Sequence, residues 1–183
     1  PLPGLVAATW LSVHRPLLPG GRAVKAWIKL LRPHQWVKSG FVFVGLLFGH
    51  GWQNPALVMQ VLLAAAAFSL AASAGYVGND LADRESDRQH PEKCRRPLAS
   101  GAIGVSAALV LGAICLALAL VLAWLASPVV LGIIVAYLLL NVGYTQGLKH
   151  VVLLDVFIIA AGFMLRILAG TIGVGITPSN WLL

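Results

Sequence analysis

The sequence predicts an all-α membrane protein, a polytopic bundle of about five transmembrane helices. Of its 183 residues, 59% are apolar and only 10% are charged, and the mean hydropathy is +0.87. Several apolar runs approach the roughly 20 residues that a helix needs to cross the hydrocarbon core of a bilayer. Lys and Arg gather in alternate loops between these runs, which is typical of helices that cross a membrane back and forth. This composition excludes an ordinary soluble domain.

The N-terminal part of the chain precedes the first predicted span. Residues 1–21 hold four Pro and three Gly with little periodicity, so we expect a poorly ordered basic arm. Within residues 22–31, Lys25 and Lys29 lie four positions apart and opposite a row of apolar side chains. This spacing predicts an amphipathic helix on the membrane surface, which should end before Pro33.

Residues 22–183 are expected to form one transmembrane domain. Stretches of small residues at 64–67 and 71–75 predict close packing between helices. An odd number of spans and an abrupt end at Leu183 suggest either that the C-terminal part of the domain is missing or that the chain forms a homo-oligomer. The predicted spans lie near residues 36–50, 56–78, 103–125, 128–145 and 151–173.

The basic residues predict the orientation of the chain in the membrane. They lie before and around the start of the first span, in the 79–101 loop and, as Lys149, in the turn at 145–150. The intervening loops hold no Lys or Arg. The positive-inside rule therefore places the N-terminus and the 79–101 loop in the cytoplasm, with the spans in the inner (plasma) membrane. Because the net charge of +7 is distributed in this way, we expect no nucleic-acid partner.

Five of the six acidic residues lie in the 79–101 loop. On a continuous helix, Asp80, Asp83 and Asp87 fall within roughly 60° of one another, and carboxylates this close repel unless a cation joins them. Clustered oxygen donors without Cys or His favour Mg²⁺, which usually shares its shell with substrate phosphates. We therefore expect these three carboxylates to be catalytic and to hold Mg²⁺ and a pyrophosphate. The alternative is a solvated loop whose acids pair with Arg84 and Arg88.

Cationic residues before and after the aspartates are candidates for binding phosphate oxygens. For those at the membrane surface, snorkelling and topology are the alternative explanations. For Lys149, its spacing from Tyr144 favours phosphate binding. The candidates are Lys38, Lys93, Arg95, Arg96 and Lys149.

Asp155 and Arg166 lie inside the fifth predicted span, where a charge costs roughly 2.5–3.5 kcal/mol on insertion scales. They share a helix face but are roughly 16 Å apart along the axis, so they cannot pair directly. Each therefore needs another partner, which is a second helix, a substrate phosphate or water.

The motif Asn79-Asp-x-x-Asp-x-x-x-Asp87, with Arg-Pro-Leu-Ala-Ser-Gly at 96–101, resembles the first aspartate-rich motif of the UbiA-type intramembrane prenyltransferase superfamily. Segments at 31–38, 90–93, 144–150 and 155–166 are similar to the decaprenyl-phosphate phosphoribosyltransferase branch. The resemblance implies that this chain is the front part of a nine-helix fold.

The resemblance also implies an activity. Enzymes of this branch are Mg²⁺-dependent and transfer 5-phosphoribosyl from phosphoribosyl pyrophosphate to a polyprenyl (decaprenyl) phosphate, in the biosynthesis of cell-wall arabinan. The lipid phosphate attacks C1 of the ribose as pyrophosphate leaves, with oxocarbenium character at the sugar. The alternative is a UbiA-type prenyltransferase that moves an isoprenoid from its diphosphate to an aromatic acceptor. A transporter fragment would need polar residues inside several spans, and the second to fourth spans hold few.

Carried onto this chain, the resemblance implies roles for individual residues. Asn79 would join the three aspartates in holding Mg²⁺ and the donor pyrophosphate. The phosphate contacts would come from Lys38, Arg95, Arg96 and Lys149, with Tyr144 nearby.

Overall fold

The structure is a computed structural model that describes residues 20–146 and 152–177 of the chain. Every regular element within these residues is a helix, which confirms the predicted fold class. Most of the predicted N-terminal arm lies outside the described residues, and its last two residues begin the first helix instead. In chain order the α-helices are α1 (Gly20–Leu31), α2 (Val44–Phe48), α3 (Pro55–Ala82), α4 (Arg84–Gln89), α5 (Val105–Ala126), α6 (Pro128–Gln146) and α7 (Val152–Gly170).

Helix α1 has the predicted amphipathic character. Leu30 is fully buried and belongs to a small apolar cluster beneath α1, whereas Lys25 and Lys29 are exposed. The ammonium group of Lys29 donates a hydrogen bond to the carbonyl oxygen of Arg95, 3.0 Å away, which ties α1 to the acidic loop. The helix ends one residue before Arg32, as the Pro at position 33 predicts.

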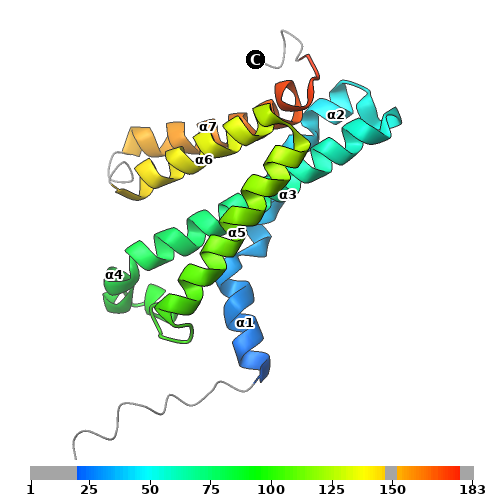
Figure 1. Ribbon diagram of the computed structural model, residues 1–183. Coiled ribbons are helices and arrows are strands. Elements are labelled where there is room, and N and C mark those ends of the chain that lie inside the picture. The colour runs from blue at the N-terminus through cyan, green and yellow to red at the C-terminus, as the bar shows by residue number, and fades with distance from the viewer. Residues whose placement is uncertain (1–19, 147–151, 178–183) are drawn as a thin grey trace, which may run out of the picture.

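The first predicted span differs from an ordinary helix. It is a 3₁₀ helix, η1 (Pro33–Phe43), followed by the single α-helical turn of α2. A 3₁₀ helix rises about 2.0 Å per residue, so these 16 residues extend over roughly 30 Å, close to the thickness of the hydrocarbon core. The extended geometry offsets the small number of residues. In Figure 1, α1 and α2 accordingly lie at opposite ends of the molecule.

The other four predicted spans are confirmed as long apolar helices. By length and hydropathy, the helices that can cross a membrane occupy Pro55–Ala82, Val105–Ala126, Pro128–Thr145 and Val156–Val174. Residues that commonly begin a helix stand at the start of two of them. Asn54 caps α3 by accepting hydrogen bonds from the N–H groups of Ala56 and Leu57. Pro128 begins α6, and only Ser127 separates it from α5.

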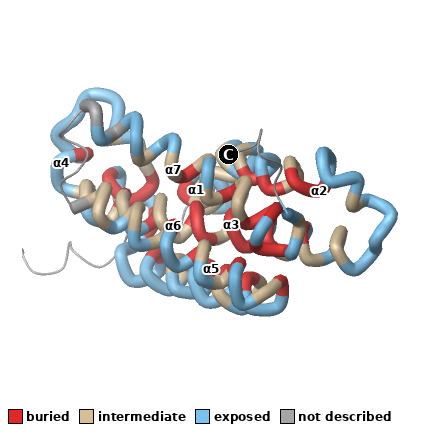
Figure 2. Tube along the Cα trace, turned by 90° about the horizontal axis from the view of Figure 1, so that it is seen from above, coloured by how far each residue is buried: buried red, intermediate tan, exposed pale blue. Residues whose placement is uncertain are grey.

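Helix α3 is the centre of the bundle and packs against α5, η1, α6, α1 and α7. The buried residues concentrate along it (Figure 2). Alanines on its face at positions 64, 67 and 71 are fully buried, as are Ala119 and Ala123 on α5. The side chains at this interface are small, so the two helix backbones approach closely, as the small-residue stretches predict.

Two glycines allow η1 and α2 to cross α7. A Cβ atom added to Gly170 would overlap the carbonyl oxygen of Val42, and one added to Gly45 would overlap the carbonyl oxygen of Gly170. Because Gly45 and Gly170 have no side chain, the backbone of α7 can lie directly against the backbones of Val42 and Gly45. This crossing brings the beginning of the bundle against its last described helix.

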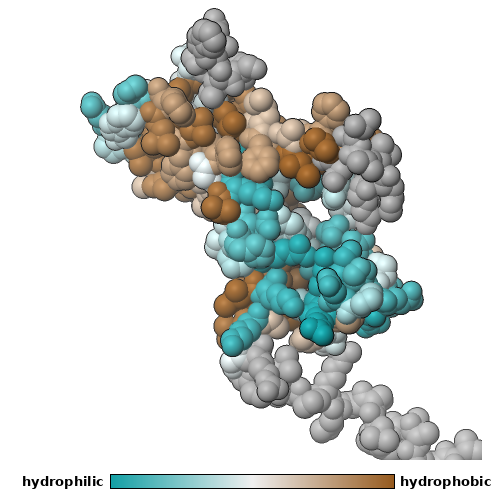
Figure 3. Space-filling view, turned by 180° about the vertical axis from the view of Figure 1, so that it is seen from behind, coloured by the Kyte–Doolittle hydropathy of each residue, from teal (hydrophilic) through white to brown (hydrophobic). Residues whose placement is uncertain are grey.

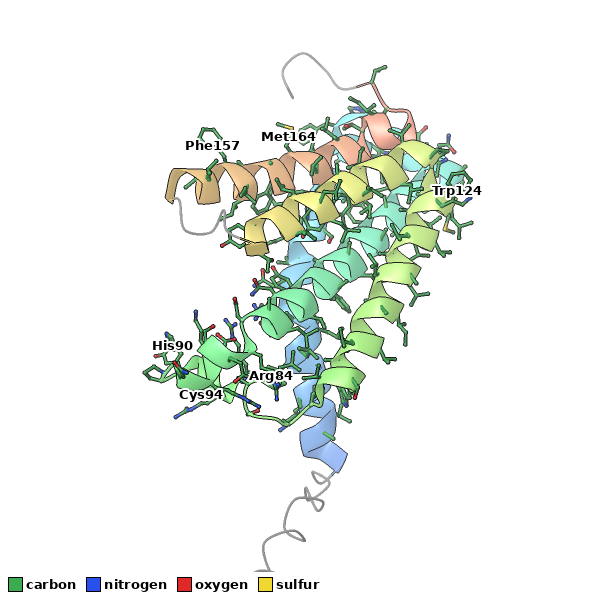
Figure 4. The ribbon with its side chains drawn as sticks, turned by 60° about the vertical axis from the view of Figure 1, so that its left-hand side comes forward. Arg84, His90, Cys94, Trp124, Phe157 and Met164 are labelled. Carbon is green, nitrogen blue, oxygen red and sulfur yellow. The ribbon has the colours of Figure 1, made fainter. Side chains whose placement is uncertain are left out.

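Helices α6 and α7 run side by side and diverge from α3 and α5 toward the end that carries α4 (Figure 1). The outer sides of the helices are apolar. Trp124 on α5 and Phe157 and Met164 on α7 point outward (Figure 4), with exposed fractions of 60%, 70% and 39%. Surfaces of this kind are expected to face lipid or further helices.

Candidate active site at the end of helix α3

The aspartate motif lies where α3 gives way to α4. A helix face shared by the three aspartates requires one continuous helix, but the helix is interrupted at Asp83. Asp80 therefore belongs to the last turn of α3 and Asp87 to α4. The interruption is one residue long, and the Asp87 N–H still donates to the Asp83 carbonyl. Figure 3 shows hydrophilic residues gathered over the part of the surface that includes this end of the bundle.

One guanidinium group joins two buried carboxylates. The Nη1 atom of Arg96 lies 2.7 Å from Oδ2 of Asp87 and 3.2 Å from Oδ1 of Asp80. The two aspartates are only 3% and 2% exposed. Buried carboxylates with charge-assisted partners are held in a defined geometry. Asp80 and Asp87 therefore converge through a bridging arginine, and not on the helix face that was predicted for all three aspartates.

A second arginine, absent from the candidate site residues of the sequence analysis, completes the cluster. The Nη2 atom of Arg32 lies 2.7 Å from Oδ1 of Asp80, and its guanidinium lies 4.8 Å from the ring centre of Tyr76. Arg32 has left-handed backbone angles (φ 51°, ψ 55°), which are uncommon for a residue with a side chain. Its place beside Pro33 at a membrane surface suggested only a topology role.

Asp83 is directed differently from the other two aspartates. Its Oδ2 accepts a hydrogen bond of 3.2 Å from Nδ2 of Asn79. The amide oxygen of Asn79 lies 3.5 Å from the hydroxyl of Thr145, near the end of α6. Asn79 thus connects the aspartate motif to the end of α6. The candidate residue Tyr144 precedes Thr145 and therefore lies at the same end of the bundle.

The donors at this site suit a hard cation. Asp80, Asp83, Asp87 and Asn79 supply only oxygen atoms, which are the ligands that Mg²⁺ prefers. Among the described residues, no three His, Cys, Asp or Glu side chains form a ready metal-binding group. The reason is visible in the geometry, because the Arg96 guanidinium lies between two of the carboxylates. The chemistry of the donor set fits Mg²⁺, and the magnesium site stays a prediction.

The alternative of a solvated loop describes the outer part of this segment. Glu85 is exposed and pairs with Arg84 and Arg88, as that alternative predicts. Lys93 and Arg95 are also exposed, and neither forms an ion pair with an aspartate in the described part of the chain. Of the three basic candidates that follow the motif, only Arg96 is brought into the buried cluster.

A separate cavity of about 230 Å³ brings together three other predicted residues, Lys38 from η1, Tyr144 from α6 and Arg166 from α7. Tyr76 also lines it, so the cavity and the aspartate cluster share one wall through the contact of Tyr76 with Arg32. Tyr76, Tyr137 and Phe163, which also line this cavity, could not be recognised from the sequence, because aromatic residues in a span ordinarily indicate packing.

Two candidates remain without a described position for their side chains. Lys149 lies outside the described residues. Asp155 lies within the described backbone of α7, and its side chain is not described.

Comparison with known proteins agrees with this fold. A sequence profile of the UbiA prenyltransferase family matches residues 39–183. A solved structure from work on digeranylgeranylglyceryl phosphate synthase in membranes superposes with a TM-score of 0.71 at 28% identity, covering 81% of this chain and 52% of that chain.

Curated relatives are similar over most of this chain. The decaprenyl-phosphate phosphoribosyltransferase of Corynebacterium glutamicum is 38% identical over 160 residues, which cover 85% of this chain and 48% of that protein. The enzyme of the same name from Mycobacterium tuberculosis strain H37Rv is 34% identical over 173 residues, or 90% of this chain and 56% of that protein. The chain spans about half the length of the curated relatives it matches. Because the profile matches well over half of the chain and the helical fold agrees with it, the chain belongs to the UbiA prenyltransferase family.

Proposed function

We propose that this chain is part of an integral membrane transferase that moves 5-phosphoribosyl from phosphoribosyl pyrophosphate to a polyprenyl phosphate, such as decaprenyl phosphate. The observation that carries the proposal is the buried cluster of Asp80, Asp87 and Arg96 at the polar end of an apolar bundle. Its support from comparison is the name shared by the relatives from C. glutamicum and M. tuberculosis. The corresponding cellular role is the supply of a lipid-linked pentose for cell-wall arabinan.

The aspartates are assigned to the donor pyrophosphate. Asp80, Asp83, Asp87 and the amide oxygen of Asn79 would hold Mg²⁺, which would neutralise the leaving pyrophosphate and orient it. Arg96 is suited to the remaining pyrophosphate oxygens, because its planar guanidinium can bind two of them at once.

The transfer itself exchanges one bond for another. The C1–oxygen bond to pyrophosphate breaks, and a phosphate oxygen of the lipid bonds to C1 from the opposite face. The electron pair of the broken bond leaves with pyrophosphate. The attacking phosphate is already anionic, so the step needs no general base. This suits a cluster of Asp and Arg that contains no His.

The orientation follows from the solubility of the donor. Phosphoribosyl pyrophosphate is water-soluble and highly charged, so the end of α3 should face the cytoplasm, with the bundle in the inner (plasma) membrane. The basic residues of α1 and of the 79–101 loop support this orientation. The proposal includes assembly with further copies of the protein, through the exposed apolar sides of the helices.

A donor exchange on the purified complete gene product tests the function. One reaction contains Mg²⁺, polyprenyl phosphate and phosphoribosyl pyrophosphate, and the other contains Mg²⁺, a prenyl diphosphate and an aromatic acid. Pyrophosphate release and lipid products are followed in both. Turnover with the ribosyl donor alone supports the proposal. Turnover with the prenyl donor alone replaces it with the isoprenoid-transfer alternative, and turnover with neither rejects both.

A further inference from the structure

Helix α1 carries an apolar strip that the described part of the bundle leaves uncovered. Val24 and Ile28 lie four positions apart, and therefore on one side of the helix, and they are 57% and 51% exposed. The adjoining side is docked, because Leu30 is buried and Trp27 packs against the small apolar cluster beneath α1. The apolar face of α1 is thus wider than the surface against which it packs, and Val24 and Ile28 form its outer strip.

An apolar groove of about 550 Å³ lies where α1 meets the beginning of α5. Its lining is Trp27, Ser106, Ala107, Val110, Leu111 and Ile114. Val110 and Ile114 are 59% and 51% exposed, and they belong to a helix that is long and apolar enough to cross a membrane. Figure 1 shows α1 at the end of the molecule where α5 begins. Helix α1 therefore lies where a span leaves the hydrocarbon core, which is the depth of the lipid headgroups.

Exposed cations gather on α1 and in the loop beside it. Lys25 and Lys29 lie one turn apart, and the hydrogen bond of 3.0 Å from Lys29 to the carbonyl oxygen of Arg95 brings Lys93 and Arg95 next to α1. In the described part of the chain, none of these four side chains forms an ion pair. Glu92 is exposed in the same loop, so the group keeps a net positive charge. Lysines one turn apart repel each other, and a nearby anion reduces that cost.

Contacts at the end of α1 fix the direction of the outer strip. Leu30 is fully buried, and Arg32, directly after the helix, pairs with Asp80 of α3 at 2.7 Å. The hydrogen bond from Lys29 holds the polar side of the helix to the loop. Because α1 is held on both sides, it presents Val24 and Ile28 outward in the folded protein.

An apolar strip next to unpaired cations matches a membrane surface that contains anionic phospholipids. Such a surface supplies hydrocarbon for the strip and negative charge for the cations. Phosphatidylcholine would cover the strip but brings no net charge to Lys25 and Lys29. An acidic soluble protein would match the cations, but it would not fit a strip and a groove that lie beside the lipid-facing side of a span.

We propose that the outer strip of α1, together with Lys25, Lys29, Lys93 and Arg95, is a docking surface for anionic phospholipids. An acyl chain of one such lipid lies in the groove between Trp27 and Ile114. The inference needs no substrate and is independent of the proposed function.

Contact between α1 and individual lipids tests the surface. The purified complete gene product carries Cys94→Ser and Val24→Cys, and the fluorophore NBD is attached to the introduced cysteine. The protein without an introduced cysteine gives the background. In phosphatidylcholine nanodiscs, spin-labelled phosphatidylglycerol should quench NBD at least roughly twofold more than spin-labelled phosphatidylcholine does at equal mole fraction. The control is Leu125→Cys, which is 61% exposed at the other end of α5, and both lipids should quench it equally.

Charge variants then separate the cations from the apolar strip. Lys25→Gln combined with Lys29→Gln should bring the ratio of the two quenching values close to one, whereas Lys25→Arg combined with Lys29→Arg should preserve it. Raising the salt concentration should lower the ratio of the unaltered surface. Equal quenching by both lipids at Val24→Cys, or a ratio that the glutamine variants leave unchanged, would overturn the preference for anionic lipid. Weak quenching by both lipids would show that protein and not membrane covers the strip, and it would overturn the docking surface itself.

Discussion

The guanidinium group of Arg32 lies 2.7 Å from the carboxylate of Asp80, although the two residues are 48 positions apart. The pair joins the end of the surface helix α1 to the end of the central helix α3. Asp80 is buried, and it also accepts from Arg96. Arg32 reaches Asp80 from a left-handed backbone conformation. The free-energy cost of this conformation is offset by the packing of the folded state.

Arg32→Gln is expected to destabilise the protein by about 1–3 kcal/mol, because it removes one partner of a buried carboxylate while Arg96 remains. Arg32→Lys should recover part of this loss. Thermal unfolding in detergent measures the effect. Lys25→Gln, which removes a cation from the exposed face of α1, is the control. Equal midpoints for Arg32→Gln and Lys25→Gln would contradict the importance of the pair.

Asp80→Asn and Asp83→Asn should each abolish Mg²⁺-dependent turnover and leave membrane insertion intact, because a neutral amide binds Mg²⁺ and its pyrophosphate far more weakly than a carboxylate does. Activity is measured as pyrophosphate release across a Mg²⁺ titration, and insertion is measured by membrane fractionation. Glu92→Gln, in the exposed part of the same loop, is the matched control. Wild-type turnover in either aspartate variant would reject the metal assignment.

Gly170→Ala should prevent normal folding, because its Cβ would overlap the carbonyl oxygen of Val42 and that backbone cannot move without separating η1 from α7. The expected readout is loss of the monodisperse peak in size-exclusion chromatography. Gly132→Ala is the control, since a Cβ there meets nothing within 4 Å and alanine favours a helix. A normal peak for Gly170→Ala would mean that the close crossing of the two segments is wrong.

Asn54→Ala removes the N-cap of α3 and should cost about 1 kcal/mol, the usual contribution of such a cap. The N–H groups of Ala56 and Leu57 lose their acceptor. The thermal midpoint in detergent should fall, while it should be nearly unchanged for Gln53→Ala, the exposed neighbour. Indistinguishable midpoints would show that α3 needs no side-chain cap.

Cys94 provides a test of orientation. It lies in the segment after α4 (Figure 4) and is partly exposed. Cys115, in α5, is buried. A membrane-impermeant maleimide should label the protein in inside-out vesicles and leave it unlabelled in intact cells. Cys94→Ser should remove the labelling. Labelling in intact cells would place this loop outside and reverse the proposed topology.

The spans could be predicted from the sequence because hydropathy and helix length are local properties. Each of the helices α3, α5, α6 and α7 carries its own apolar run, so its position does not depend on its neighbours. The ends of these helices were equally local, since Asn54, Pro55 and Pro128 act on the adjacent backbone. The aspartate-rich motif could be recognised for the same reason, because all its residues lie within one short segment of the sequence.

The partners of the charged residues were decided only by the tertiary structure. A lysine or arginine at a membrane surface has the same sequence context whether it fixes topology or pairs with a buried acid, so Arg32 could not be distinguished from Lys25. The pairing of Asp80 and Asp87 through Arg96 depends on a helix interruption at Asp83 and on the return of the loop, neither of which follows from helical periodicity.

The same holds for the cavity at Arg166. The sequence could state that a charge inside a span needs a partner, because the cost of burial is a general property of hydrocarbon. Which rings, hydroxyl groups and second cation surround it depends on how η1, α3, α6 and α7 pack. Local patterns therefore determined where the helices lie in the sequence, while the electrostatics of the site arose from contacts between segments that only packing brings together.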